Sequence, residues 1–299
     1  MIEVKGVSKA FGPEKALDMV SLSVKKGSIY GLMGPNGAGK TTLIKCMVDI
    51  YKPDEGEIYI SGQRISQNKR LKSRIGYVAD VQYFYPQFSV KDMAAFYRQT
   101  YPGWHEERYQ KLKDVFGIDE KKKLRELSKG TKAQLGIFLN LSINADMLIL
   151  DEPTSGLDPV VRQKVLNLLV EEAGANETTI FISSHSLGEL ERICDHVGIM
   201  HKGKIIMEAS IEDLKEKVRK IQVAFDGEMP ETIALRKDIL SIKNQGRVYH
   251  LVVKDGISEI MKDINQLSPI LLETIDMSLE EIFIYKMGGE GYAFEDFSL

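Results

Sequence analysis

The chain has 299 residues, 43% of them apolar, and a formal net charge of −3. This length is large for one domain, so we expect a large domain with a smaller one attached. The absence of a basic excess gives no support for a nucleic-acid partner. No apolar run approaches the roughly 18 to 20 residues that a helix needs to cross a bilayer, so a membrane function requires another polypeptide to supply the span.

The two cysteines, Cys46 and Cys194, fall in predicted helices of a chain that shows no signal peptide. Disulfides persist mainly in oxidising compartments, so this pattern indicates reduced thiols. We therefore expect a cytoplasmic location.

Alternating apolar residues predict strands over Ile2–Val7 and Ala16–Val24. Phe11 lies in the expected turn between these strands. Two roles are equally supported for its ring, namely stacking on a purine base and packing over its own hairpin.

A glycine-rich segment follows and reads G-x-x-x-x-G-K-T, the phosphate-binding P-loop. Ser28–Met33 predicts a strand before it, and Thr42–Val48 predicts a helix after it. Polyphosphate approaches a main chain closely where side chains are missing, and the positive end of a helix favours the same anion. Lys40 supplies a charge for the β- and γ-phosphates, and the Thr41 hydroxyl supplies a ligand for Mg²⁺. The expected phosphate contacts are Gly34, Pro35, Asn36, Gly37, Ala38, Gly39, Lys40, Thr41 and Thr42.

Composition changes after Asp80, where the aromatic loop Tyr83–Phe88 precedes a series of helical patterns. Ser89 is a candidate cap for the first helix, and a second helix is expected over about residues 105–116. This helical insert ends near Asn140. Its aromatic loop has two readings, a docking surface and the core of the insert.

The apolar run Met147–Leu150 predicts a buried strand that ends in two carboxylates, Asp151 and Glu152. Taken alone, such a pair is usually a helix cap or a surface turn. Downstream of a P-loop, it predicts a Mg²⁺ ligand in Asp151 and, in Glu152, a base that orients and deprotonates a water molecule.

The pattern of strand and helix then continues. Asp158 precedes a proline and is the expected N-cap of a helix. Residues 178–183 predict a strand, the segment 186–189 reads as a capping box, and residues 196–207 read as a hairpin. From about Val218, four strand patterns and two helical patterns predict a small α+β domain without a catalytic constellation, with a ferredoxin-like fold as the candidate.

Taken together, these segments resemble the ATP-binding subunit of an ABC transporter across residues 1 to about 215. Leu127–Thr131 resembles the signature motif of that family, and Ser155–Asp158 resembles its D-loop. His185 lies at the position of the switch histidine, Phe11 at that of the adenine-stacking aromatic residue, and Asp80 at that of the Q-loop.

The resemblance implies an α/β P-loop NTPase of ABC type, with a RecA-like core, an antiparallel β subdomain and a helical subdomain over about residues 84–140. It implies a nucleotide-binding domain over residues 1–217 and a small domain over 218–299, for which regulation is the candidate role. The implied cofactors are ATP and Mg²⁺, and the implied reaction is ATP hydrolysis. The residues implied beyond the P-loop are Glu152 and His185 with Lys40 in catalysis, Thr41, Asp80 and Asp151 at the metal, and Phe11, Ser128, Gly130 and Asp158 at the nucleotide.

The chain departs from the family pattern at two places. Lys129 and Thr131 stand where the signature motif usually has glycine and glutamine, and Asp80 stands where the Q-loop usually has glutamine. Ser128 still offers a hydroxyl to a γ-phosphate. Gln82 is an alternative to Asp80, which we prefer because of its spacing.

In this family the signature motif of one subunit completes the P-loop site of another, so the resemblance implies a homodimer or heterodimer that encloses two ATP molecules. It also implies separate integral membrane subunits, a position at the inner face of the cell membrane, and export of a drug, antibiotic, peptide or lipid. A soluble ABC ATPase that acts on ribosomes or DNA is the alternative. Such proteins usually carry tandem cassettes or a long coiled coil, and this chain has one P-loop and no sustained heptads.

Overall fold

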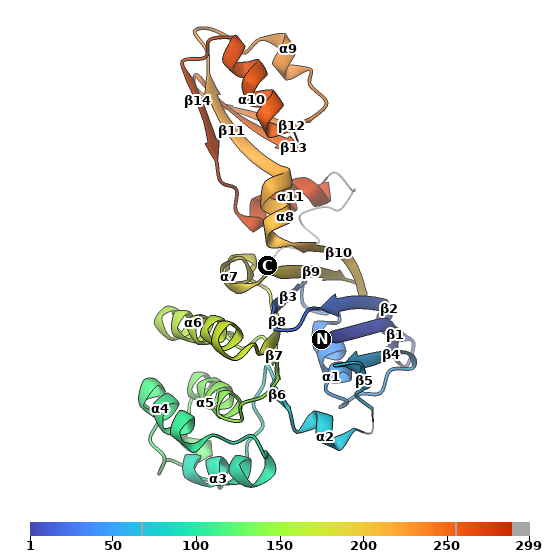
Figure 1. Ribbon diagram of the computed structural model, residues 1–299, viewed down its shortest axis with the longest axis vertical. Helices are drawn as coiled ribbons and strands as arrows, with labels where there is room; N and C mark the ends of the chain where they lie inside the picture. The colour runs from blue at the N-terminus through green and yellow to red at the C-terminus, as the bar shows by residue number, and fades with distance from the viewer. Residues whose placement is uncertain (67, 255, 289–299) are drawn as a thin grey trace. The chain divides into compact units, whose positions relative to one another are not determined.

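The computed structural model describes residues 1–66, 68–254 and 256–288 (Figure 1), and the chain divides into two compact units. The first unit covers Met1–Glu208 and the second begins at Ala209. The boundary lies before the expected residue 217, because the helix α8 (Ile211–Lys217) contacts β11 (Val218–Ala224) and α11 (Leu279–Gly288) of the second unit. The last residues of the expected second domain, 289–299, lie outside the described residues.

The first unit begins with an antiparallel sheet whose strands lie in the order β2-β1-β4-β5. Ile2 and Val4 of β1 are buried whereas Glu3 and Lys5 are exposed, because successive side chains of a strand point to opposite faces. The strands are β1 (Ile2–Phe11), β2 (Glu14–Val24), β4 (Glu55–Ile60) and β5 (Gln63–Arg64).

The second sheet has six strands in the order β10-β9-β3-β8-β7-β6, and those from β9 to β6 run parallel. All residues of β3, β7 and β8 are buried, as is typical of parallel strands that are covered on both faces. Because β8 lies between β3 and β7, it separates the strand before the P-loop from the strand that ends at the carboxylates. The strands are β3 (Ile29–Met33), β6 (Ile75–Val78), β7 (Met147–Asp151), β8 (Thr179–Ser184), β9 (His196–His201) and β10 (Lys204–Ser210).

Helix α1 (Lys40–Met47) packs in the core that the two sheets share. Leu43 and Ile44 of this helix belong to the same buried cluster as Leu22 of the first sheet and Leu32 of the second. The P-loop therefore joins two elements, β3 and α1, whose positions are fixed by a close-packed interior.

The chain between β6 and β7 forms a group of helices at one end of the first unit (Figure 1). Its interior is aromatic: the ring centroids of Tyr109 and Phe138 are 5.4 Å apart, and those of Phe116 and Phe138 are 6.0 Å apart. The helices of the first unit beyond α1 are α2 (Lys69–Lys72), α3 (Val90–Thr100), α4 (Glu106–Phe116), the 3₁₀ turn η1 (Leu124–Glu126), α5 (Lys129–Leu141), α6 (Pro159–Asn176) and α7 (Leu187–Ile193).

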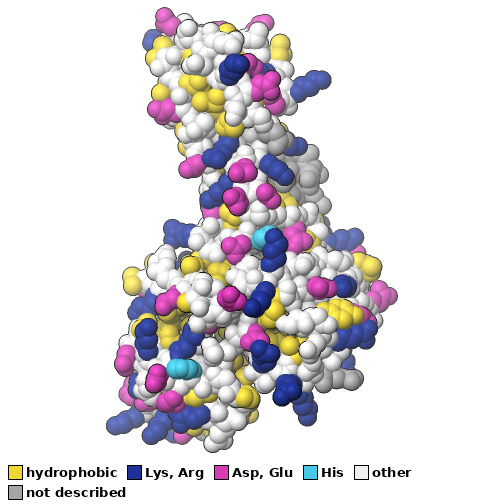
Figure 2. All heavy atoms as spheres, in the orientation of Figure 1, with side chains coloured by type: hydrophobic (Ala, Val, Ile, Leu, Met, Phe, Trp, Pro, Cys, Tyr) yellow, Lys and Arg dark blue, Asp and Glu magenta, His cyan; other side chains and the backbone are white. Residues whose placement is uncertain are grey.

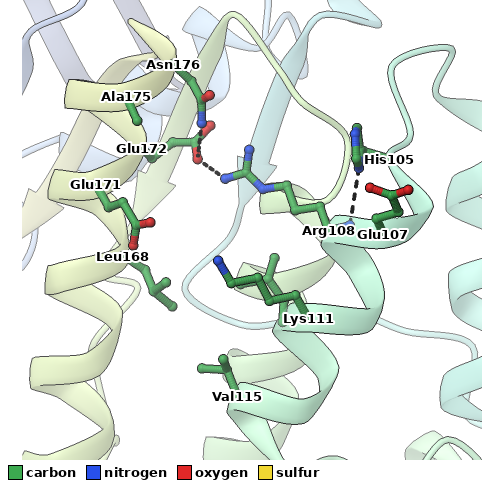
Figure 3. Close-up of a pocket in the computed structure, with 11 residues that line it drawn as sticks. His105, Glu107, Arg108, Lys111, Val115, Leu168, Glu171, Glu172, Ala175 and Asn176 are labelled. Carbon is green, nitrogen blue, oxygen red and sulfur yellow. Dashed lines mark hydrogen bonds and ion pairs between the residues drawn. The ribbon is translucent and has the colours of Figure 1, made fainter.

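An ion pair between the partly buried Arg108 of α4 and the buried Glu172 of α6 ties these helices to the rest of the unit, beside a cavity of about 380 Å³ (Figure 3). The Glu172 carboxylate also accepts hydrogen bonds from Thr178 Oγ1 at 2.9 Å and from Asn176 Nδ2 at 3.2 Å. Burial lowers the pKa of the Arg108 guanidinium. The pair thus links the helical insert to α6 through a carboxylate that also accepts hydrogen bonds from two neighbouring side chains.

The second unit contains an antiparallel sheet in the order β12-β13-β11-β14. From β11 to β14 the elements follow the succession β-α-β-β-α-β of ferredoxin-like folds. Ile221 and Leu251 of the sheet form a buried core with Ile260 and Ile264 of α10, which covers one sheet face. The remaining elements are α9 (Glu231–Ala234), β12 (Ile239–Gln245), β13 (Val248–Lys254), α10 (Ile257–Gln266) and β14 (Leu271–Ile275).

Candidate functional site

The P-loop turns closely around the start of α1. A Cβ atom on Gly34 would lie 2.3 Å from the Met200 carbonyl oxygen, and Gly39 has a φ of 108°, so both positions require glycine. Lys40 is only 6% exposed, and its Nζ donates to the carbonyl oxygens of Gly34 at 2.5 Å and Pro35 at 3.4 Å. The loop encloses one side of a cavity of about 300 Å³. The residues that line it are Phe11, Glu14, Ala16, Pro35, Asn36, Gly37, Ala38, Gly39, Lys40, Thr41, Thr42, Asp80 and Glu152.

Two of the three side chains expected to act in catalysis, Lys40 and Glu152, line this cavity, and the third, His185, contacts Glu152. Glu152 Oε1 lies 3.3 Å from Lys40 Nζ, and Glu152 Oε2 lies 2.9 Å from His185 Nδ1. Each carboxylate oxygen of Glu152 therefore faces a different partner. His185 is exposed, whereas Lys40 and Glu152 are largely enclosed.

Asp151 is almost completely buried, and its two carboxylate oxygens differ. Ser183 Oγ donates a hydrogen bond of 2.7 Å to Oδ1, whereas Oδ2 is buried and forms no hydrogen bond with the described residues. Burial raises the pKa of Asp151, and the Ser183 hydroxyl and the nearby Thr41 side chain oppose this shift. A buried carboxylate oxygen without a donor, beside a threonine hydroxyl, fits a hard cation such as Mg²⁺.

Asp80 is exposed and lines the cavity, as expected of a residue near the phosphates. Its alternative, Gln82, points elsewhere: Gln82 Nε2 donates to the Ala79 carbonyl oxygen at 2.6 Å, and the side chain packs against Gly136 of α5. The structure therefore brings Asp80, and not Gln82, to the P-loop.

Four expected nucleotide contacts do not line this cavity, namely Gly34, Ser128, Gly130 and Asp158. The Gly34 carbonyl oxygen instead accepts a hydrogen bond from Lys40 Nζ. Ser128 is the N-cap of α5, where its Oγ accepts a hydrogen bond of 3.1 Å from the Thr131 backbone. Asp158 is the N-cap of α6 and accepts hydrogen bonds from the backbone N–H groups of Val160 at 3.1 Å and Val161 at 3.0 Å. Gly130 approaches the D-loop segment, so a Cβ atom there would lie 3.4 Å from the Gly156 carbonyl oxygen.

Phe11 is the last residue of β1, and the turn itself begins at Gly12. The ring of Phe11 is 46% exposed and lines the cavity. It also meets the Tyr51 ring edge-on, with centroids 5.4 Å apart, and Lys9 Nζ lies 5.7 Å from its centroid. The ring is thus supported by the protein on one side and open to a ligand on the other.

Sequence patterns did not indicate the role of Ser183 at the site or the contacts of Glu189 nearby. Ser183 joins Asp151 and Glu152, because its Oγ also accepts a hydrogen bond of 3.0 Å from the Glu152 backbone N–H. Glu189 does not form the expected capping box, since the Ser186 side chain makes no cap hydrogen bond. The Glu189 carboxylate instead accepts a hydrogen bond from Thr154 Oγ1 at 2.6 Å and lies 3.2 Å from Arg162 Nη1.

Comparisons with known proteins identify the family to which the chain is similar. A family model described as ABC transporter matches residues 17–155. The ABC transporter ATP-binding protein YtrB of Bacillus subtilis is 35% identical over 97% of this chain and 99% of its own length. The bacitracin transport ATP-binding protein BcrA of Bacillus licheniformis is 32% identical over 97% of this chain and 98% of its own length. A solved structure described as an ATP binding subunit of an ABC transporter has a TM-score of 0.66 at 27% identity, over 72% of this chain and 92% of that one.

The chain therefore belongs to the ABC transporter family, as an ATP-binding subunit. The family has the P-loop NTPase fold expected from the sequence. Among the described residues, no helix is both long enough and apolar enough to cross a membrane.

Proposed function

We propose that this chain hydrolyses ATP with Mg²⁺ held by Thr41, Asp80 and Asp151, and that hydrolysis drives export through separate membrane subunits. The observation that carries the proposal is the position of Glu152, whose oxygens lie 3.3 Å from Lys40 Nζ and 2.9 Å from His185 Nδ1 beside the P-loop cavity. This arrangement suits a base that faces the γ-phosphate of a bound nucleotide.

In the proposed reaction, Glu152 accepts a proton from the water that attacks the γ-phosphorus. The bond from that phosphorus to the bridging oxygen breaks, and ADP leaves with the electron pair. Lys40 and His185 contact the γ-phosphate oxygens, and bound Mg²⁺ would neutralise charge on the β- and γ-phosphates. In the free protein the Lys40 ammonium is paired with the Glu152 carboxylate. When phosphate binds, Lys40 must exchange this partner for a phosphate oxygen. The exchange leaves the Glu152 carboxylate available to accept the proton of the attacking water.

We further propose that a second ATP-binding subunit, identical or related, completes the site. Ser128, Gly130 and Asp158 lie outside the cavity that the P-loop of the same chain encloses. A partner would present its own copies of these residues to the nucleotide. The γ-phosphate would then bridge two chains, and its hydrolysis would remove the bridge.

The transported substrate is proposed from the relatives alone. BcrA carries the name of a bacitracin transport protein and matches this chain almost from end to end. We therefore favour export of an antibiotic, a drug, a peptide or a lipid. The names of YtrB and BcrA refer to an ABC transporter and to bacitracin transport, which favours this role over the alternative on ribosomes or DNA.

The aromatic loop is the proposed contact with the membrane subunits, which would place the chain at the inner face of the cell membrane. Tyr83 is 90% exposed, so it does not belong to the core of the helical insert. Tyr85 is half exposed and rests on Phe88 and Phe96, with centroid distances of 5.0 Å and 6.2 Å. Exposed aromatic side chains on a packed base are typical of an interaction surface.

Purification of the tagged chain from its native membrane tests these proposals. Membrane proteins should accompany the wild-type chain, and exchange of Tyr83 and Tyr85 for serine should remove them while ATP hydrolysis continues. Val170→Ser, which alters an exposed apolar residue of α6, is the control and should retain the membrane partners. Ribosomal proteins in place of membrane proteins would contradict the transporter function, and unchanged co-purification of the double variant would contradict the docking surface.

The second unit is proposed to be regulatory. None of the residues that line the P-loop cavity comes from it. Deletion of residues 209–299 should therefore change the rate of ATP hydrolysis but leave nucleotide binding intact. Fluorescence of a bound nucleotide analogue would report the binding. Complete loss of binding by a folded deletion variant would contradict this role.

A further inference from the structure

Ser183 is fully buried in β8, and its single hydroxyl contacts both of the residues that carry the carboxylates of the site. Ser183 Oγ donates to Asp151 Oδ1 at 2.7 Å and accepts from the Glu152 backbone N–H at 3.0 Å. The parallel pairing of β7 with β8 brings Asp151 opposite Ser183, so the contact is built into the sheet.

The first of these hydrogen bonds makes the two oxygens of Asp151 unequal. A serine hydroxyl has one proton to donate, and here that proton is committed to Oδ1. Oδ2 is left buried and without a hydrogen bond from the described residues. The Ser183 hydroxyl thereby fixes the orientation of the Asp151 carboxylate and determines that Oδ2 is the oxygen available to a ligand.

The second hydrogen bond stabilises an unusual backbone conformation. Glu152 has a φ of 48°, in the left-handed region that residues with a side chain adopt at a cost. This conformation turns the chain away from β7. The backbone N–H of Glu152 then donates its hydrogen bond to Ser183 Oγ. The same turn directs the Glu152 carboxylate toward Lys40 and His185.

The neighbouring serine does not duplicate this role. Ser184 Oγ donates to Glu189 Oε2 at 3.3 Å and accepts from the Ser186 backbone N–H at 3.0 Å. Adjacent side chains of a strand point to opposite faces, so Ser183, and not Ser184, reaches the Asp151 carboxylate and the Glu152 backbone.

The geometry points to Ser183 as the positioning residue of this site, a single hydroxyl that selects the free oxygen of Asp151 for a divalent cation and holds the turn that aims Glu152. The inference rests on the proposed function, because it concerns the proposed metal ligand and the proposed base. It predicts that loss of one hydroxyl weakens metal binding and turnover together, while contacts of the P-loop with ATP persist.

The test compares Ser183→Ala and Ser183→Cys with Ser142→Ala. Ser142 is equally buried, and its hydroxyl donates to the Phe138 carbonyl oxygen at 2.7 Å, away from the P-loop cavity, so its loss controls for removal of a buried hydroxyl. Mn²⁺ binding in the presence of ATP is followed by electron paramagnetic resonance, which requires no hydrolysis. The Mg²⁺ dependence of hydrolysis and the KM for ATP at saturating Mg²⁺ are measured in parallel.

Partners of metal ligands typically contribute about 10- to 100-fold to metal affinity or activity, so Ser183→Ala should weaken Mn²⁺ binding and kcat by about that range. The KM for ATP should change by less than about threefold, since the P-loop contacts remain. Ser183→Cys keeps the shape with a weaker donor and should lie between Ala and wild type. If the alanine variant does not fold, the cysteine variant provides the measurement.

Metal binding and kcat that are unchanged in a folded Ser183 variant would overturn the inference and leave the proposed function standing. Equal losses in Ser142→Ala would overturn it as well, because they would reflect stability alone. A wild-type chain that neither hydrolyses ATP nor binds Mn²⁺ with ATP would overturn the proposed function, and the inference with it.

Discussion

Exchange of Glu152 for glutamine separates nucleotide binding from hydrolysis. Glutamine retains the shape of the side chain but cannot accept the proton of an attacking water. It also removes the negative charge that lies 3.3 Å from Lys40 Nζ in the free protein. We therefore expect slower turnover and tighter ATP binding from one substitution.

The structure sets the size of both effects. A positioned general base contributes about 10²- to 10⁴-fold to a rate, so the turnover of Glu152→Gln should fall by that factor. The Lys40–Glu152 pair is largely enclosed, with side-chain exposures of 7% and 14%, so Lys40 is held more firmly than in a surface pair. Release of Lys40 from this pair in Glu152→Gln should favour ATP binding by up to about 1.4 kcal/mol, or tenfold in the Kd for ATP.

Phosphate release under single-turnover conditions measures the rate, and displacement of a fluorescent ATP analogue measures the affinity. Glu171→Gln is the matched control, because Glu171 is an exposed residue of α6 beside the cavity of Figure 3 and should leave both values unchanged. Turnover above about one tenth of the wild-type rate would refute the assignment of Glu152 as the base. ATP binding weaker than in the wild type would refute the competition between Glu152 and phosphate for Lys40.

Three further substitutions test other parts of the structure. Glu172→Ala removes the hydrogen-bond partner of the partly buried Arg108 and should lower the free energy of unfolding by about 1–3 kcal/mol in denaturant titrations; a change like that of Glu171→Ala would contradict this. Phe11→Ala should weaken ATP binding by only about 0.5–1.5 kcal/mol, and GTP should compete with ATP in a displacement assay, because phosphate contacts dominate; failure of GTP to compete would contradict this. The raised pKa of Asp151 means that the folded chain holds this proton more tightly than the unfolded chain, so stability falls as pH rises through the two pKa values. Asp151→Asn, which is neutral, should therefore raise the melting temperature at neutral pH in EDTA, and a lower melting temperature would contradict this reasoning.

Local motifs in the sequence predicted the side chains that converge on the P-loop. Lys40 follows directly from the glycine pattern, and Asp151 and Glu152 follow from the end of an apolar strand. The prediction of Asp80 over Gln82 rested on spacing, and the structure places Asp80 at the cavity. The metal and nucleotide roles of these residues remain predictions.

Features that depend on strand order were not predicted. Ser183 acts on Asp151 only because β8 inserts between β3 and β7, and no local pattern indicates that order. Glu189 has the spacing of a capping box, but tertiary contacts with Thr154 and Arg162 take its carboxylate away from the helix start. The boundary of the second unit was placed too late because α8 has a regular helical pattern that does not reveal which unit it packs against.

The most direct test of a nucleotide site shared between two chains is the molar mass of Glu152→Gln in solution, measured by light scattering. ATP should persist in this variant, so its γ-phosphate should keep the two chains together. We expect the mass to double at saturating Mg²⁺ and ATP, and to return to that of one chain when the nucleotide is removed. A mass that stays at one chain under saturating Mg²⁺ and ATP would contradict a site shared between two copies of this chain.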